Sequence, residues 1–204
     1  MRSPSVDVSR LKGYFVCLLP HKIVAMKFGI IGSGSWATAL AKILTDNNHH
    51  INWWMRSEES ISYIQKRRHN PHYLTNAHFD LNLLQVSSSL AYVVGDSEIL
   101  IIAVPSAYIH DVLTTLNSDS FANKKIISAI KGLLPGSNEL LNHYLNKNFN
   151  VALKDYFAVT GPCHAEEVAA EKLSYLTFSG VDEQTAAEIA YCFKNEYLNT
   201  VVNH

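Results

Sequence analysis

Short apolar runs alternate with longer amphipathic stretches along most of the chain. The apolar runs read as strands over 28–31, 51–55, 83–86, 98–104, 124–130, 156–160, 173–178 and 197–202. The stretches between them predict helices over 35–44, 57–68, 89–94, 106–116, 138–145, 165–171 and 182–193. This alternation predicts an α/β fold, a Rossmann-like, doubly wound and mostly parallel sheet with helices on both faces.

The first strand and the first helix are joined by a glycine turn. Gly32 and Gly34 follow the apolar run at once, and Ala37 comes three residues later. Gly32 permits a tight turn, Gly34 lets a pyrophosphate approach the backbone, and Ala37 lets the helix pack close to the strand. The free N–H groups that open the helix favour an anion. A turn used only for packing does not explain this spacing, so we predict a dinucleotide site over 32–36.

The second strand ends at Arg56, about where the adenosine ribose of a dinucleotide would lie. NAD-specific proteins usually carry Asp or Glu at this point, whereas a cation suits a 2′-phosphate. The cofactor is therefore NADP or NAD, with NADP favoured. The alternative is that Arg56 is a solvent-exposed residue at the edge of the sheet.

Three further segments lie where a ligand is expected. Tyr73, in the loop after the second helix, either contacts the cofactor or packs within its loop. Lys131 follows the apolar strand 124–130 at its carboxyl end, the edge at which α/β sheets bind ligands. The segment 161–167 joins a strand to a helix, and its exposed N–H groups are a second place for an anion.

Composition restricts the partners. The 204 residues carry a net charge of −1, which gives no reason to expect nucleic acid or an acidic membrane surface as a partner. No apolar run reaches the roughly 18 residues of a membrane span. The three cysteines are far apart and form no CxxC pair, which fits a reduced, cytoplasmic setting. The ten histidines lack ligand spacing, so we predict no metal site.

The first 25 residues stand apart from this pattern. They contain a short apolar patch, 14–19, that is interrupted by Pro20 and is followed by no small-residue cleavage site. Met26 immediately precedes the first strand. We therefore expect residues 1–25 to be a disordered upstream extension, with translation starting at Met26, and residues 26–204 to form the nucleotide-binding domain.

From Met26 onward the chain resembles the bacterial type of NAD(P)-dependent glycerol-3-phosphate dehydrogenase. The matching elements are Gly32-Ser33-Gly34-Ser35-Trp36-Ala37-Thr38-Ala39-Leu40-Ala41, Trp54-Met55-Arg56, Asn70 with Tyr73-Leu74, Ala103-Val104-Pro105-Ser106, Lys131-Gly132 and Gly161-Pro162-Cys163-His164-Ala165-Glu166-Glu167. The resemblance implies reversible reduction of dihydroxyacetone phosphate to sn-glycerol 3-phosphate, the entry to glycerophospholipid synthesis. A homodimer is a candidate assembly.

The resemblance also implies roles for individual residues. Cofactor contacts are expected at Ser35, Trp36, Arg56 and Ala165, in addition to Gly32, Ser33, Gly34 and Tyr73. Lys131 is expected between cofactor and substrate, where it assists the reaction without being the acid/base, and Gly161 and Cys163 are expected substrate contacts. Cys163 and His164 depart from the family, which commonly has Ser or Thr followed by Phe, and Ala37 replaces a usual glycine. A backbone contact at Cys163 would survive that change, but a hydroxyl contact would be weakened.

The family has a second, helical domain that carries the acid/base lysine and the residues that clamp the substrate phosphate. The present sequence contains no match to that domain, so we expect this chain to be inactive alone and to hold no catalytic acid/base. Two alternatives stay open. One is another two-domain NAD(P) reductase with the same first domain, and the other is a non-catalytic NAD(P)-binding module.

Overall fold

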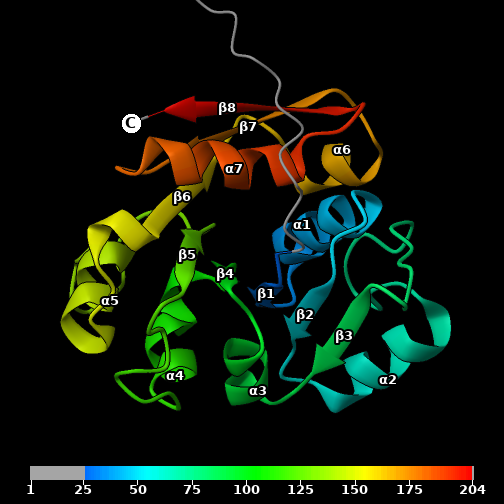
Figure 1. Cartoon of the computed structure of the whole chain (residues 1–204). Coiled ribbons are helices and arrows are strands. Elements are labelled where there is room, and N and C mark those ends of the chain that lie inside the picture. Colours follow the sequence, from blue (N-terminus) through cyan, green and yellow to red (C-terminus); the bar gives the residue numbers. More distant parts are fainter. Residues whose placement is uncertain (1–25, 204) are drawn as a thin grey trace, which may run out of the picture.

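The computed structural model describes residues 26–203, so the expectations for residues 1–25 lie outside the described residues. One eight-stranded sheet runs through them (Figure 1). Its strands are β1 Phe28–Ile31, β2 Ile51–Trp54, β3 Leu84–Ser87, β4 Ile99–Ile102, β5 Lys125–Ser128, β6 Tyr156–Thr160, β7 Ser174–Ser179 and β8 Leu198–Asn203. The helices are α1 Ser35–Asp46, α2 Glu58–Arg67, α3 Leu90–Gly95, α4 Ile109–Leu113, α5 Leu141–Phe149, α6 Ala165–Ala169 and α7 Glu183–Phe193.

The strand order is β3-β2-β1-β4-β5-β6-β7-β8. All neighbouring strands are parallel except β6 and β7, which pair antiparallel with Val159 opposite Phe178. The prediction of a doubly wound, mostly parallel sheet is confirmed. Because β1 lies between β2 and β4, the chain reverses its direction of travel across the sheet at this point, where α/β sheets form their ligand crevice.

Apolar side chains form a separate core on each face of the sheet. One core joins α1, α2, α6 and α7 to the strands, with Phe28, Trp53 and Phe178 fully buried in it. The other core joins α3, α4 and α5 to the opposite face, through Leu100, Ile102 and other residues of the strands. None of the helices within residues 26–203 combines the length and the apolar character needed to cross a membrane.

Several helix starts follow directly from the sequence. The Ser57 side chain accepts a hydrogen bond from the Ser60 N–H at 3.2 Å, and that of Asp182 accepts one from the Thr185 N–H at 3.1 Å. Both are N-caps, which satisfy amide groups that the helix itself leaves without a partner. The hydrogen bonds that Asp182 accepts also keep the pKa of its carboxyl below the usual value.

Two predicted helices differ from the structure. The helix expected over 106–116 is a 3-10 turn, Ser106–Tyr108, followed by α4, which ends at Leu113. The Thr114 and Thr115 hydroxyls donate to the carbonyls of the preceding turn, a side-chain-to-backbone bond that competes with helix formation. The helix expected over 138–145 begins only at Leu141, since the Leu134 N–H donates to the Glu139 carbonyl in a short bridge.

Two predicted strands are shorter than expected, and the difference is informative. The strand expected over 98–104 ends at Ile102, and that expected over 124–130 ends at Ser128. Residues 103–106 leave the sheet at its carboxyl edge beside the end of β1, and residues 129–131 leave it one strand further along, beside the end of β4. They turn outward to form the walls of a cavity.

Candidate functional site

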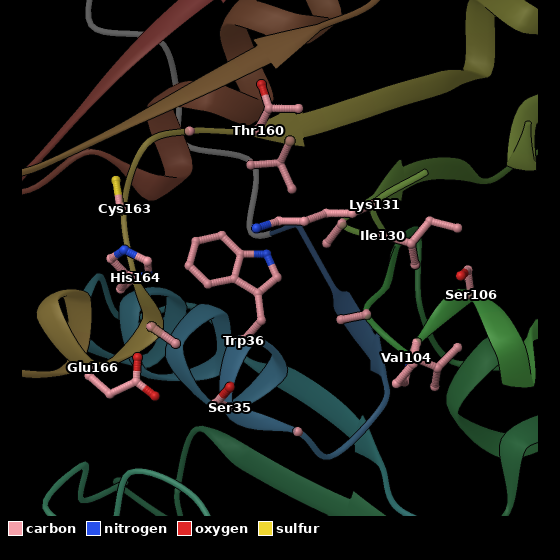
Figure 2. Close-up of a pocket in the computed structure, with 17 residues that line it drawn as sticks. Ser35, Trp36, Val104, Ser106, Ile130, Lys131, Thr160, Cys163, His164 and Glu166 are labelled. Atoms are coloured by element: carbon pink, nitrogen blue, oxygen red, sulfur yellow. The ribbon is translucent and has the colours of Figure 1, made fainter. Parts of the chain in front are cut away.

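A cavity of about 570 Å³ lies at the carboxyl ends of β1, β4, β5 and β6 (Figure 2). Five segments line it: 34–36, 103–106, 129–131, 159–161 and 163–166. They come from the loops that follow four strands and from the start of α1 and α6. The cavity therefore occupies the topological switch point predicted for a dinucleotide.

Most of the residues selected from the sequence meet in this cavity. Those that line it are Gly34, Ser35, Trp36, Lys131, Gly161, Cys163 and Ala165. Gly32 and Ser33 form the turn directly before Gly34, whereas Arg56 and Tyr73 lie outside the lining and are exposed. Residues to which the sequence gave no role, such as Thr160, His164 and Glu166, also line the cavity. Their position at the end of β6 or shortly after it was the available signal.

The turn between β1 and α1 requires its first glycine. Gly32 has φ of 128°, in the region that L side chains rarely adopt. A Cβ there would lie 2.6 Å from the Ala103 carbonyl oxygen. The Gly32 carbonyl in turn accepts a hydrogen bond from the Trp53 indole N–H at 2.6 Å. The turn is thus fixed against both β4 and β2.

The start of α1 fits a diphosphate group. The first turn holds no acidic residue and no side chain caps it, so the amides at its N-terminus are left for an anion. Apart from Gly34 and its two chain neighbours, no described residue has an atom within 4 Å of the place that a Cβ on Gly34 would take. The free amides, the open space and the positive end of the 12-residue helix together suit a dinucleotide pyrophosphate.

Lys131 supplies the positive charge in the cavity. It is exposed, and it follows β5 immediately before Gly132, whose φ is 78°. Figure 2 shows its side chain extending across the cavity toward the Trp36 indole. An ammonium group there can stabilise negative charge that develops on a bound carbonyl oxygen.

The Cys163 thiol is engaged by the protein. It donates to the Tyr175 carbonyl at 2.8 Å and accepts from the Tyr175 N–H at 3.1 Å, so it ties the loop to β7. Gly161 also approaches β7, since a Cβ there would lie 2.5 Å from the Tyr175 carbonyl oxygen. Any ligand contact at these two residues is therefore expected through the backbone.

The start of α6 suits an anion less well than its sequence suggested. Glu166 and Glu167 stand in the first turn, and the Glu167 carboxylate accepts a hydrogen bond from the His164 N–H at 3.5 Å. Negative charge is thus already present at this helix end. Of the two helix starts, that of α1 is therefore the better suited to a phosphate group.

Arg56 lies at the carboxyl end of β2, as predicted, and its side chain is exposed. The neighbouring Ser57 hydroxyl is used to cap α2. Beside them, the Trp54 indole N–H donates to the Ser88 carbonyl at 2.9 Å, which joins this point to the end of β3. Arg56 is accordingly the cation at the place expected for the adenosine ribose.

Two further observations concern a reactive thiol and a metal site. Burial raises the pKa of the Cys192 thiol to about 11, so this residue stays a neutral thiol at physiological pH. Within residues 26–203, no cluster of three or more His, Cys, Asp or Glu side chains is arranged to hold a metal ion.

Comparison with known proteins identifies a matching family and relatives of similar sequence. The family model described as NAD-dependent glycerol-3-phosphate dehydrogenase N-terminus matches residues 27–186. Curated relatives include glycerol-3-phosphate dehydrogenase [NAD(P)+] of Streptococcus pneumoniae, 31% identical over 175 residues, which are 85% of this chain and 52% of the relative. The same protein of Halalkalibacterium halodurans is 30% identical over 175 residues, which are 85% of this chain and 50% of the relative. The chain spans about half the length of these relatives.

Similar solved structures include glycerol-3-phosphate dehydrogenases. Glycerol-3-phosphate dehydrogenase from Coxiella burnetii is 25% identical, with a TM-score of 0.79 over 87% of this chain and 54% of that chain. The Plasmodium falciparum enzyme is 27% identical, with a TM-score of 0.78 over 87% of this chain and 52% of that chain. An imine reductase from Myxococcus stipitatus, 12% identical with a TM-score of 0.58 over 87% of this chain and 54% of that chain, shares the fold alone.

Proposed function

Because this chain belongs to the NAD-dependent glycerol-3-phosphate dehydrogenase N-terminus family, we propose that it is the cofactor-binding part of a sn-glycerol-3-phosphate dehydrogenase. The observation that carries the proposal is the cavity at the switch point, where the open N-terminus of α1 and the Lys131 ammonium face the same space. The reaction is the reduction of dihydroxyacetone phosphate, which supplies sn-glycerol 3-phosphate for glycerophospholipid synthesis. A cytoplasmic location and a homodimer belong to the same proposal.

In this proposal, the segments that line the cavity have different roles toward the cofactor and the substrate. The backbone amides at residues 34–36 hold the pyrophosphate, and the Trp36 side chain and residues 103–106 border the space for the nicotinamide. A bound nicotinamide supplies the hydride for the substrate carbonyl. Lys131 holds the carbonyl oxygen and stabilises the charge that develops on it. The backbone at Gly161 and Cys163 borders the substrate.

NADP is the favoured cofactor because Arg56 follows β2, at the place expected for the adenosine ribose. We expect Arg56→Ala to weaken NADPH binding about tenfold, since a charge-assisted hydrogen bond to the 2′-phosphate is lost. NADH binding should stay within about twofold, because NADH has no 2′-phosphate to lose. The measurement is titration calorimetry of the 204-residue chain with each cofactor.

Arg67→Ala is the matched control, because Arg67 is an exposed arginine at the far end of α2. It should bind both cofactors as the unmodified chain does. Equal affinity of the unmodified chain for NADPH and NADH would remove the NADP preference and leave the dehydrogenase proposal intact. Binding of neither cofactor would contradict the proposed site itself.

We expect the 204-residue chain to turn over dihydroxyacetone phosphate at a negligible rate even when NADPH is bound. Among the described residues that line the cavity, Lys131 is the single lysine or arginine, so one cation must serve both the carbonyl oxygen and the substrate phosphate. The assay is NADPH oxidation followed by absorbance, with the Streptococcus pneumoniae enzyme as the positive control. Turnover comparable to that of the control would refute the expectation.

A further inference from the structure

Asn70 is an almost fully buried polar residue beside the glycine turn. It lies in the loop after α2, and 2% of it is exposed. Its amide Nδ2 donates to the Ser33 carbonyl at 3.1 Å and to the Thr38 hydroxyl at 2.9 Å. Its Oδ1 accepts from the N–H groups of His72 at 3.0 Å and Tyr73 at 3.3 Å. Both ends of the amide are therefore in use.

These contacts hold successive carbonyl groups of the glycine turn. The Gly32 carbonyl accepts from Trp53, and the Ser33 carbonyl accepts from Asn70. The Gly34 carbonyl accepts from the Thr38 hydroxyl at 2.9 Å and from the Thr38 N–H at 3.0 Å. Because the Thr38 hydroxyl also accepts from Asn70, this one amide reaches two of the three carbonyls.

Fixing a carbonyl fixes the next amide. In a trans peptide the C=O of one residue and the N–H of the next point in opposite directions. Holding the carbonyls of residues 32–34 against the protein therefore turns the N–H groups of residues 33–35 away from it. Gly34 and Ser35 line the cavity, so their amides are presented on the side where a ligand would bind.

We propose that Asn70 is a positioning residue for the dinucleotide, acting through the peptide groups that hold the pyrophosphate. The proposal rests on the cofactor-binding function proposed above. It assigns Asn70 two tasks, the orientation of the turn at residues 33–34 and the attachment of the segment that carries Tyr73 to that turn. Asn70 does not line the cavity and is not a catalytic residue.

An amide is the one ordinary side chain of this size that can perform both tasks. Its NH₂ group donates twice to the turn while its oxygen accepts twice from residues 72 and 73. A carboxylate of the same shape keeps the two acceptor contacts but places an unprotonated oxygen against the Ser33 carbonyl. Asn70→Asp therefore removes the donors without changing the volume.

The test is the affinity of the 204-residue chain for NADP⁺ as a function of pH. At about pH 8 we expect Asn70→Asp to bind about ten- to a hundredfold more weakly than the unmodified chain, because buried hydrogen bonds are lost. Burial raises the pKa of the introduced carboxyl, and its protonated form can donate again. The deficit should therefore shrink as the pH falls to about 5.5.

The comparison is made as a ratio of affinities at each pH. The Nδ1 of His69 lies 3.1 Å from the Asn70 carbonyl, and His72 follows two residues after Asn70. These two side chains and the 2′-phosphate of the ligand are common to both comparisons, so the ratio isolates the introduced carboxyl. Thermal unfolding of each chain reports stability separately.

Asn52→Asp is the matched control. Asn52 is a buried asparagine in β2, and its Nδ2 donates to the Asp96 carbonyl at 3.1 Å, away from the cavity. The same chemical change there should lower the melting temperature and leave NADP⁺ affinity within about twofold of the unmodified chain. An effect on affinity as large as that of Asn70→Asp would overturn the proposal.

A second pair of variants covers the case in which Asn70→Asp fails to fold. Thr38→Val removes the hydroxyl that relays Asn70 to the Gly34 carbonyl, and we expect NADP⁺ affinity to fall about tenfold. Thr38→Ser keeps the hydroxyl and should restore it. If the unmodified chain binds NADP⁺ and Thr38→Val or Asn70→Asp binds it equally well, Asn70 is only structural. If the unmodified chain does not bind, the proposed function fails first.

Discussion

Gly34→Ala is expected to lower the affinity for NADP⁺ at least about a hundredfold while leaving the fold intact. The added methyl group would occupy the space in which the pyrophosphate approaches the backbone. The structure leaves that space open, since no described residue other than Gly34 and its two chain neighbours has an atom within 4 Å of it. Gly34 has φ of −76°, which alanine adopts without strain. The affected property is therefore binding.

The expected stability change at Gly34 is small because two effects oppose each other. Alanine reduces the conformational freedom of the unfolded chain, which stabilises, but it is a poorer N-cap than glycine. The net change in the free energy of unfolding should stay within about 1 kcal/mol. Urea unfolding measures this value, and calorimetry with NADP⁺ measures the affinity.

Gly95→Ala is the control for this variant. Gly95 is the last residue of α3, and a Cβ there would also meet nothing within 4 Å. Since Gly95 does not line the cavity, its alanine variant should bind NADP⁺ like the unmodified chain. Unchanged affinity in Gly34→Ala would mean that no phosphate group approaches the backbone at this residue, and the dinucleotide site would have to be placed elsewhere.

The sequence predicted those parts of the site that depend on residues close together in the chain. The strand, the glycine turn and the helix of residues 28–46 follow one another directly, so spacing alone identified them. Helix caps such as Ser57 were predictable for the same reason, since the capping side chain and the amide it binds are three residues apart.

Contacts between distant segments were beyond the sequence pattern. The hydrogen bond from Trp53 to Gly32 joins residues 21 apart, and that from Asn70 to Ser33 joins residues 37 apart. The polar atoms of a buried asparagine give no periodic signal that would identify their partners. The antiparallel step from β6 to β7 was likewise unpredicted, because a short connection through α6 does not specify strand direction by its composition.

The Cys163 thiol illustrates the same limit at the substrate side. The sequence presented Cys163 as an expected substrate contact, through the backbone or the side chain, where the family commonly has Ser or Thr. Only the three-dimensional arrangement places its sulfur between the N–H and C=O of Tyr175. The thiol therefore serves the attachment of the loop to β7. The residue types indicated that the loop after β6 contacts the substrate. The contact of the Cys163 thiol with Tyr175 shows that the thiol is already engaged, which leaves the backbone of the loop for a ligand.

Gly32→Ala is expected to act on stability, whereas Gly34→Ala acts on binding. The expected loss of stability is large enough to threaten folding. Alanine would be held at a φ of 128°, and its Cβ would lie 2.6 Å from the Ala103 carbonyl oxygen and 3.0 Å from the Val104 nitrogen. Backbone strain and overpacking together should lower the free energy of unfolding by about 3–5 kcal/mol. Most small domains have only about 5–15 kcal/mol in total. Urea unfolding of the 204-residue chain measures the loss.

Gly136→Ala separates the two causes of that loss. Gly136 also has a positive φ, 87°, but a Cβ there would meet nothing within 4 Å. Its alanine variant carries the backbone strain alone and should lose about 1–2 kcal/mol. The excess loss in Gly32→Ala then measures how closely the end of β1 must approach β4 for the turn to form. An equal loss in both variants would show that Ala103 and Val104 can move aside, and that contact with the end of β4 does not fix the glycine turn.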